Sequence, residues 1–128
     1  GEVSGHFYFK NSSFLEAIDY TALLVIKIWR ESGKKFSELL DPFTQYANSG
    51  EINRKVADKE EVLRRFKELY IGKADVVDET DGLRCEFSDQ WWFIIRPSNT
   101  EPIMRLTIEA VNDQLLKEKV SELSELLY

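Results

Sequence analysis

The most informative segment of the sequence spans residues 90–109. It begins Gln90-Trp91-Trp92-Phe93-Ile94-Ile95, continues Arg96-Pro97-Ser98-Asn99-Thr100-Glu101-Pro102, and ends Ile103-Met104-Arg105-Leu106-Thr107-Ile108-Glu109. The first part is almost entirely apolar, which is typical of a strand buried on both faces. The last part mostly alternates apolar and polar residues, which indicates a strand buried on one face. Because prolines bound the polar middle part and remove backbone donors there, we predict a loop between two strands.

The predicted loop has the components of an anion-binding site. Arg96 offers a guanidinium fork that matches two phosphate oxygens. Ser98 and Thr100 offer hydroxyl groups, Asn99 offers an amide, and backbone N–H groups of a tight loop can add a concave nest of positive charge. Arg105 supplies a second positive charge if its side chain faces the same side. The same residue types are common in ordinary hairpin loops, so the residue types alone leave both interpretations open.

A second candidate site lies at the start of the chain, in Gly1-Glu2-Val3-Ser4-Gly5-His6. Glu2 can accept hydrogen bonds from sugar hydroxyls, Ser4 offers a hydroxyl group, and the imidazole of His6 can exchange protons near neutral pH. An ordinary chain terminus with a surface histidine explains the same residues.

Composition narrows the class of protein. The 128 residues suit one domain, or one domain and a fragment, and the net charge of −6 disfavours nonspecific binding to nucleic acid or anionic membranes. Cys85 is the only cysteine, which predicts a chain without an internal disulfide and a reducing, cytoplasmic location. No apolar run is long enough to span a bilayer.

Hydrophobic periodicity predicts the order of the elements. Before residue 46 we expect two helices, at residues 20–30 with Asp19 as N-cap and at residues 36–40, followed by a linker at 46–50. From residue 46 onward we expect the order β-α-β-β-β-β-α, with elements at 51–56, 59–70, 75–78, 83–87, 90–95, 103–109 and 112–128. This order predicts an α+β domain, a mainly antiparallel sheet with helices on one side, preceded by a fragment of an α/β domain.

Two motifs resemble those of a known family. Arg96-Pro97-Ser98-Asn99-Thr100-Glu101-Pro102, followed by Arg105, resembles the phosphate-binding loop in the last of the four domains of the α-D-phosphohexomutases, the phosphomannomutases and phosphoglucomutases. Gly1-Glu2-Val3-Ser4-Gly5-His6 resembles the sugar-recognition loop of the third domain, and Asp81-Gly82-Leu83-Arg84 resembles a further family segment. The resemblance implies that residues 1–45 are the end of the third domain and that residues 46–128 are the fourth, phosphate-binding domain.

The resemblance also implies an activity and its substrates. Family members interconvert hexose 1-phosphates and hexose 6-phosphates of glucose or mannose through a bisphosphate intermediate, using a phosphoserine and Mg²⁺. By this resemblance the substrate-binding residues are Glu2, Ser4, His6, Arg96, Ser98, Asn99, Thr100 and Arg105, and His6 is a candidate general acid or base. The chain has neither the family's serine loop nor its aspartate-rich Mg²⁺ loop, so we expect the chain alone to be inactive.

The sequence also bears on which macromolecules the chain contacts. The helix expected at 20–30 is apolar on most of its circumference, so we expect the segment before residue 46 to fold back on the second unit, to self-associate, or to be poorly ordered. No nucleic acid and no membrane are expected as partners. The alternative function is a stand-alone binding or interaction module, for which nucleic acid is one ligand to test. The preferred sugar stays open.

Overall fold

A computed structural model describes residues 5–88 and 90–128 of the chain. Glu2 and Ser4 therefore lie outside the described residues. The chain divides into two compact units, one that ends at Thr44 and one that extends from Gln45 to Tyr128. No described helix has the length and apolar character needed to cross a membrane.

The first unit is helical where it is described. It contains the 3-10 helix η1 (Lys10–Ser12), helices α1 (Ile18–Ser32) and α2 (Phe36–Leu40), and the 3-10 helix η2 (Asp41–Phe43). The prediction that Asp19 is the N-cap of α1 was wrong, because the helix begins two residues earlier than predicted, at Ile18, and its N-cap is Ala17. Asp19 lies in the first turn instead, where a carboxylate still interacts favourably with the helix dipole. None of the residues of α1 is buried.

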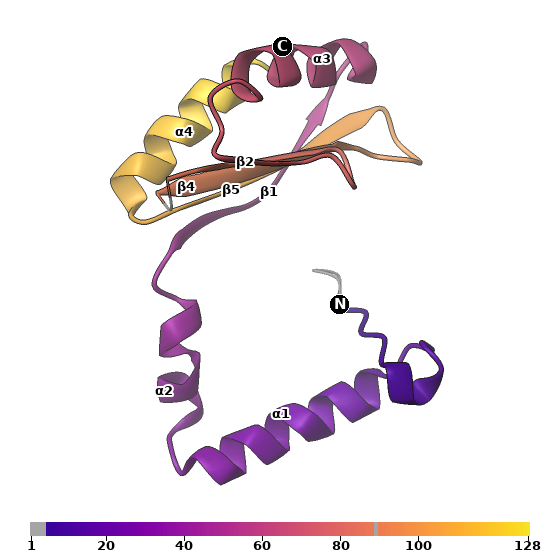
Figure 1. Cartoon of the computed structure of the whole chain (residues 1–128), viewed down its shortest axis with the longest axis vertical. Helices are drawn as coiled ribbons and strands as arrows, with labels where there is room; N and C mark the ends of the chain where they lie inside the picture. Colours follow the sequence, from indigo (N-terminus) through magenta and orange to yellow (C-terminus); the bar gives the residue numbers. More distant parts are fainter. Residues whose placement is uncertain (1–4, 89) are drawn as a thin grey trace. The chain divides into compact units, whose positions relative to one another are not determined.

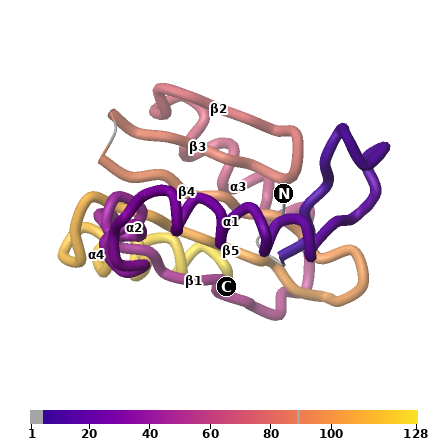
Figure 2. Tube along the Cα trace, turned by 90° about the horizontal axis from the view of Figure 1, so that it is seen from below, coloured from indigo at the N-terminus to yellow at the C-terminus, as the bar shows by residue number. Residues whose placement is uncertain are grey.

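The second unit confirms the predicted α+β architecture. Its elements follow in the order β1 (Ala47–Lys55), α3 (Lys59–Tyr70), β2 (Val76–Asp78), β3 (Leu83–Phe87), β4 (Trp91–Pro97), β5 (Ile103–Ala110) and α4 (Asp113–Glu125). The strands form one sheet in the order β1-β5-β4-β3-β2, and every neighbouring pair is antiparallel (Figure 2). Both α3 and α4 lie on the same face of this sheet (Figure 1).

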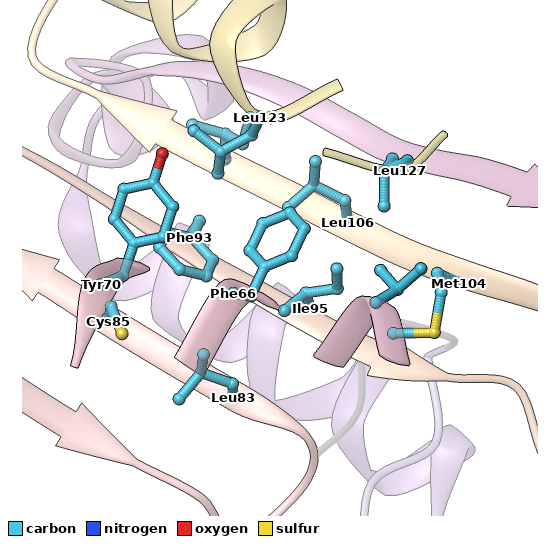
Figure 3. Close-up of a cluster of buried hydrophobic side chains, with 12 residues drawn as sticks. Phe66, Tyr70, Leu83, Cys85, Phe93, Ile95, Met104, Leu106, Leu123 and Leu127 are labelled. Carbon is cyan, nitrogen blue, oxygen red and sulfur yellow. The ribbon is translucent and has the colours of Figure 1, made fainter. Parts of the chain in front are cut away.

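The core of the second unit lies between the sheet and these two helices. Side chains from α3, α4 and the strands β3, β4 and β5 converge there (Figure 3), and each is almost completely excluded from solvent. Phe66 of α3 packs edge to face on Phe93 of β4, with ring centroids 5.6 Å apart. Alternation along β5 buries Met104, Leu106 and Ile108 against the helices. The intervening residues of β5, including Arg105, must therefore project from the opposite face of the sheet.

The segment predicted as a linker at 46–50 is mostly strand. β1 begins at Ala47, and its pairing with β5 shifts register between Asn48 and Glu51, which forms a bulge. Gly50 has φ +65°, a conformation that suits glycine, and its N–H donates to Asn48 Oδ1 at 2.7 Å. Ser49 Oγ accepts from the N–H of Ile108 at 2.9 Å. The linker prediction was wrong because the turn-forming residues Asn48, Ser49 and Gly50 form a β-bulge within a strand.

Candidate functional site

Arg96 and Arg105 lie side by side on the face of the sheet opposite α3 and α4. They are direct partners in the register of β4 and β5, and the neighbouring residues Ile95 and Leu106 are buried on the helix side. The structure therefore meets the condition under which Arg105 adds a second positive charge beside Arg96. Arg96 lies two residues before the loop at residues 98–102 that connects the two strands, and Arg105 lies three residues after it.

Carboxylates surround the two guanidinium groups. Glu51 of β1 approaches both, with its Oε2 3.5 Å from Arg96 Nη2 and its Oε1 3.6 Å from Arg105 Nη1. Asp81 Oδ2 lies 3.1 Å from Arg96 Nη1, and Glu101 Oε2 lies 3.9 Å from Arg105 Nη2. Most of these distances exceed that of a tight ion pair, and the side chains are partly exposed, so an external anion can compete with the carboxylates.

The connecting loop is organised around Ser98. Its side chain is buried, and its Oγ accepts hydrogen bonds from the backbone N–H groups of Thr100 at 3.4 Å and Glu101 at 3.2 Å. The N–H of Ser98 donates to the carbonyl oxygen of Ile103 at 3.0 Å, which closes the base of the loop. Asn99 and Thr100 are exposed at its tip. Ser98 thus fixes the loop backbone, while Asn99 and Thr100 are accessible to a ligand.

Lys59 is a contact of the loop that the sequence did not indicate. Its ammonium group donates to the carbonyl oxygen of Ser98 at 2.8 Å and to that of Glu101 at 3.4 Å. Lys59 is the first residue of α3, whose N-cap Asp58 accepts from the N–H of Glu61. In the sequence, Lys59 is one of several charged residues in the helix predicted at 59–70. The contact with Ser98 bridges 39 positions of the chain, and no local pattern reports such a distant pairing.

The Asp81-Gly82 segment supports Arg96 from the neighbouring strand. Gly82 has φ +82°, and a Cβ atom at this position would lie 2.2 Å from the carbonyl oxygen of Ile95 and 2.8 Å from Arg96 Cβ. Only glycine allows the turn to approach β4 so closely. The turn is fastened by Asp78, whose pKa is lowered by hydrogen bonds from Thr80. It thereby holds the Asp81 carboxylate next to the Arg96 guanidinium.

The described part of the amino-terminal motif includes His6. His6 Nδ1 donates to Glu16 Oε1 at 2.6 Å, so a carboxylate orients the imidazole as in many acid–base pairs. The sequence did not indicate Glu16. His6 belongs to the first unit, and Arg96 and Arg105 belong to the second.

A cavity also lies at the end of the sheet where Trp91 pairs with Ala110. It has a volume of about 310 Å³ and is lined by Tyr46, Glu86, Gln90, Trp91, Trp92, Glu109 and Ala110. Among its lining residues, Trp92 Nε1 donates to Glu109 Oε1 at 3.0 Å, and Glu86 pairs with Arg84. Among residues 5–88 and 90–128, no three His, Cys, Asp or Glu side chains gather in a way that could hold a metal ion.

Comparisons with known proteins agree with this fold. Residues 51–126 match the family described as phosphoglucomutase/phosphomannomutase, C-terminal domain. The chain is 39% identical over 127 residues to a phosphomannomutase of Methanocaldococcus jannaschii, covering 99% of the chain and 28% of that protein. It is 37% identical over 119 residues to a phosphomannomutase of Escherichia coli, covering 92% of the chain and 26% of that protein.

A solved structure is similar along almost the entire chain. A phosphoglucomutase/phosphomannomutase family protein of Burkholderia thailandensis superposes with a TM-score of 0.77 at 26% identity, covering 99% of this chain and 27% of that one. The chain thus spans less than a third of the length of these relatives. From the family match, the relatives and the shared fold together, this chain belongs to the phosphoglucomutase/phosphomannomutase family and contains its C-terminal domain.

Proposed function

We propose that this chain is the substrate-binding C-terminal portion of a phosphomannomutase/phosphoglucomutase that interconverts hexose 1-phosphate and hexose 6-phosphate. In this proposal, residues 46–128 form the phosphate-binding domain and residues 1–45 end the sugar-recognition domain. Hexose phosphates of glucose or mannose and their bisphosphate are the ligands. Mg²⁺ belongs to the phosphoserine site of the longer enzyme, and the protein acts in the cytoplasm.

The observation that carries the proposal is the pairing of Arg96 and Arg105 beside a loop with exposed donors. Guanidinium groups stay charged at every physiological pH and match the oxygens of a phosphate dianion. Asn99 and Thr100 add donors at the loop tip.

The chemical role proposed for this loop is to hold the phosphate that is not being transferred. Phosphoryl transfer depends on position and charge neutralisation, so a grip on the distant phosphate places the reacting oxygen. Glu2 and Ser4 are proposed to bind the sugar hydroxyls. His6, oriented by Glu16, is proposed to contact the substrate and to exchange a proton with it.

The test is a titration of the isotope-labelled chain with glucose 6-phosphate, followed through backbone amide and arginine Nε–H signals. We expect a dissociation constant on the order of 1 mM, because the chain supplies only part of the contacts. The shifts should cluster at residues 96–105, and glucose without phosphate should leave them unchanged.

Matched variants identify the binding residues. Arg96→Ala should abolish the shifts, whereas Arg84→Ala should preserve them, because Arg84 lies over the Trp92 ring of the same sheet and is paired with Glu86. Shifts that cluster away from residues 96–105, or that survive Arg96→Ala, would refute the phosphate-binding role. Tighter binding of single-stranded RNA than of glucose 6-phosphate would instead favour a stand-alone nucleic-acid module.

A further inference from the structure

The side chain of Lys59 contacts backbone carbonyl groups of the β4–β5 loop and not its side chains. Its ammonium group lies 2.8 Å from the Ser98 carbonyl oxygen and 3.4 Å from the Glu101 carbonyl oxygen. A carbonyl oxygen carries partial negative charge, and a phosphate held nearby would be repelled by it. The Lys59 ammonium group thus binds two carbonyl oxygens of the loop and offsets their partial negative charge.

The geometry of the peptide bond extends this effect to the next residue. No described peptide bond is cis, and a trans peptide directs its C=O and its N–H to opposite sides. The Ser98 carbonyl points to Lys59, so the N–H of Asn99 points away from Lys59. No described residue accepts a hydrogen bond from this N–H. The next two N–H groups, of Thr100 and Glu101, are already directed to Ser98 Oγ.

We propose that Lys59 is a positioning residue for phosphate binding: by holding the Ser98 and Glu101 carbonyls, it directs the Asn99 N–H toward the bound phosphate. This inference rests on the proposed function of the loop. In this role Lys59 does not touch the ligand. It pre-organises a backbone donor, which reduces the cost of ordering the loop on binding.

The competing explanation is that Lys59 attracts phosphate only through its charge. Lys55 provides a matched control, because it pairs with Ile103 at the end of β1, next to the same loop, and is exposed. Lys55→Met removes the same charge near the loop but leaves the two carbonyl contacts intact. A charge effect is also screened by salt, whereas a conformational effect is not.

The experiment compares Lys59→Met, Lys59→Arg and Lys55→Met with the unmodified chain, by titration with glucose 6-phosphate at low and high salt. We expect Lys59→Met to weaken binding about tenfold, the size expected for loss of one charge-assisted hydrogen bond. The ratio of the dissociation constants of Lys59→Met and the unmodified chain should be the same at high salt. Lys59→Arg, which keeps charged donors, should bind almost as tightly as the unmodified chain. Lys55→Met should change binding less than Lys59→Met, and its effect should vanish at high salt.

A measurement without ligand tests the conformational step directly. In Lys59→Met the amide signals of Asn99 and Thr100 should shift or broaden, while the urea midpoint of unfolding stays close to that of the unmodified chain. If Lys59→Met binds as tightly as the unmodified chain, or no more weakly than Lys55→Met, the positioning role is wrong and the proposed function stands. If the unmodified chain does not bind glucose 6-phosphate at the loop, the proposed function itself fails.

Discussion

Arg96 and Arg105 face each other directly across the β4–β5 ladder, two positive charges at paired positions on one face of the sheet. Like charges in such a pair are unfavourable by about 0.2–1 kcal/mol. Glu51 reduces the repulsion because its two carboxylate oxygens approach one guanidinium group each. The Glu51 carboxylate therefore offsets the repulsion between Arg96 and Arg105. A bound phosphate could offset the same repulsion, so this arrangement suits an anion-binding site.

Replacing Glu51 should strengthen phosphate binding. Glu51→Gln removes the carboxylate that competes for Arg96 and Arg105, so we expect the affinity for glucose 6-phosphate to rise about two- to fivefold, in line with the energy of a partly exposed ion pair. Calorimetric titration measures it. Glu86→Gln is the matched control, because Glu86 pairs with Arg84 and not with the arginines of the loop. Weaker binding by Glu51→Gln would show that Glu51 organises the arginines rather than competes for them.

Gly82→Ala should destabilise the second unit by about 2 kcal/mol or more, because the new Cβ atom meets both positive φ strain and the backbone of Ile95 and Arg96. Two other glycines separate these causes. Gly50 has φ +65° and Gly72 has no positive φ, and a Cβ atom at either meets nothing within 4 Å. Urea unfolding should rank the losses Gly82→Ala, then Gly50→Ala, then Gly72→Ala. Equal losses of unfolding free energy in Gly82→Ala and Gly50→Ala would contradict the prediction, because they would mean that β4 accommodates the new Cβ atom without an energetic cost.

The sequence allowed the order of elements in the second unit to be predicted because the signals are local. The cap at Asp58, the helical spacing of Val62 and Phe66, and the alternation in β5 each act within a few residues. The bulge at Asn48–Gly50 could not be distinguished from a linker, since both use the same residue types.

The candidate site was predictable only in part for the same reason. The residues of the β4–β5 loop are contiguous and were identified from the sequence. Lys59, Glu51 and Asp81 contact that loop or its arginines from distant parts of the chain, through pairings that only the folded sheet creates. The sequence therefore did not distinguish Lys59 from the other charged residues of its helix.

Cys85 should make the second unit less stable at alkaline pH. Burial in the core raises the pKa of its thiol from 9.0 to about 11. Between these values the unfolded chain loses the proton while the folded chain keeps it, so stability is complete below about pH 9 and falls as pH rises toward 11. We expect this group alone to cost about 1–2 kcal/mol at about pH 10.5. Urea unfolding at pH 8 and at about pH 10.5, compared between the unmodified chain and Cys85→Ala, isolates the effect. A pH-independent difference between the two proteins would contradict the assignment.

The chain should self-associate through α1. None of the residues of this helix is buried, and Leu23, Ile26 and Ile28 are respectively 64%, 47% and 54% exposed. Exposed apolar side chains gathered on one helix usually find a partner. Sedimentation velocity over a wide concentration range should show reversible association, and Leu23→Asp should reduce it. Lys27→Asp, a change on the same helix at a charged position, serves as control. A concentration-independent monomer with an ordered α1 would overturn this expectation.

The chain purified alone should have no phosphohexomutase activity. Its proposed contributions are contacts that position a sugar and one phosphate, and turnover also requires a phosphorylated nucleophile. Ser98 lies in the proposed phosphate loop, and it is buried with its Oγ engaged by two backbone N–H groups. A buried hydroxyl so placed supports the loop and is not exposed for attack.

The activity measurement is a coupled assay with glucose 1-phosphate or mannose 1-phosphate, Mg²⁺ and catalytic glucose 1,6-bisphosphate. We expect no turnover above background, because positioning contacts multiply the rate of a reaction only where the reacting groups are present. Turnover that survives repurification and disappears in Arg96→Ala would contradict the prediction. It would require a nucleophile within these 128 residues, and Ser98→Ala would be the first variant with which to locate it.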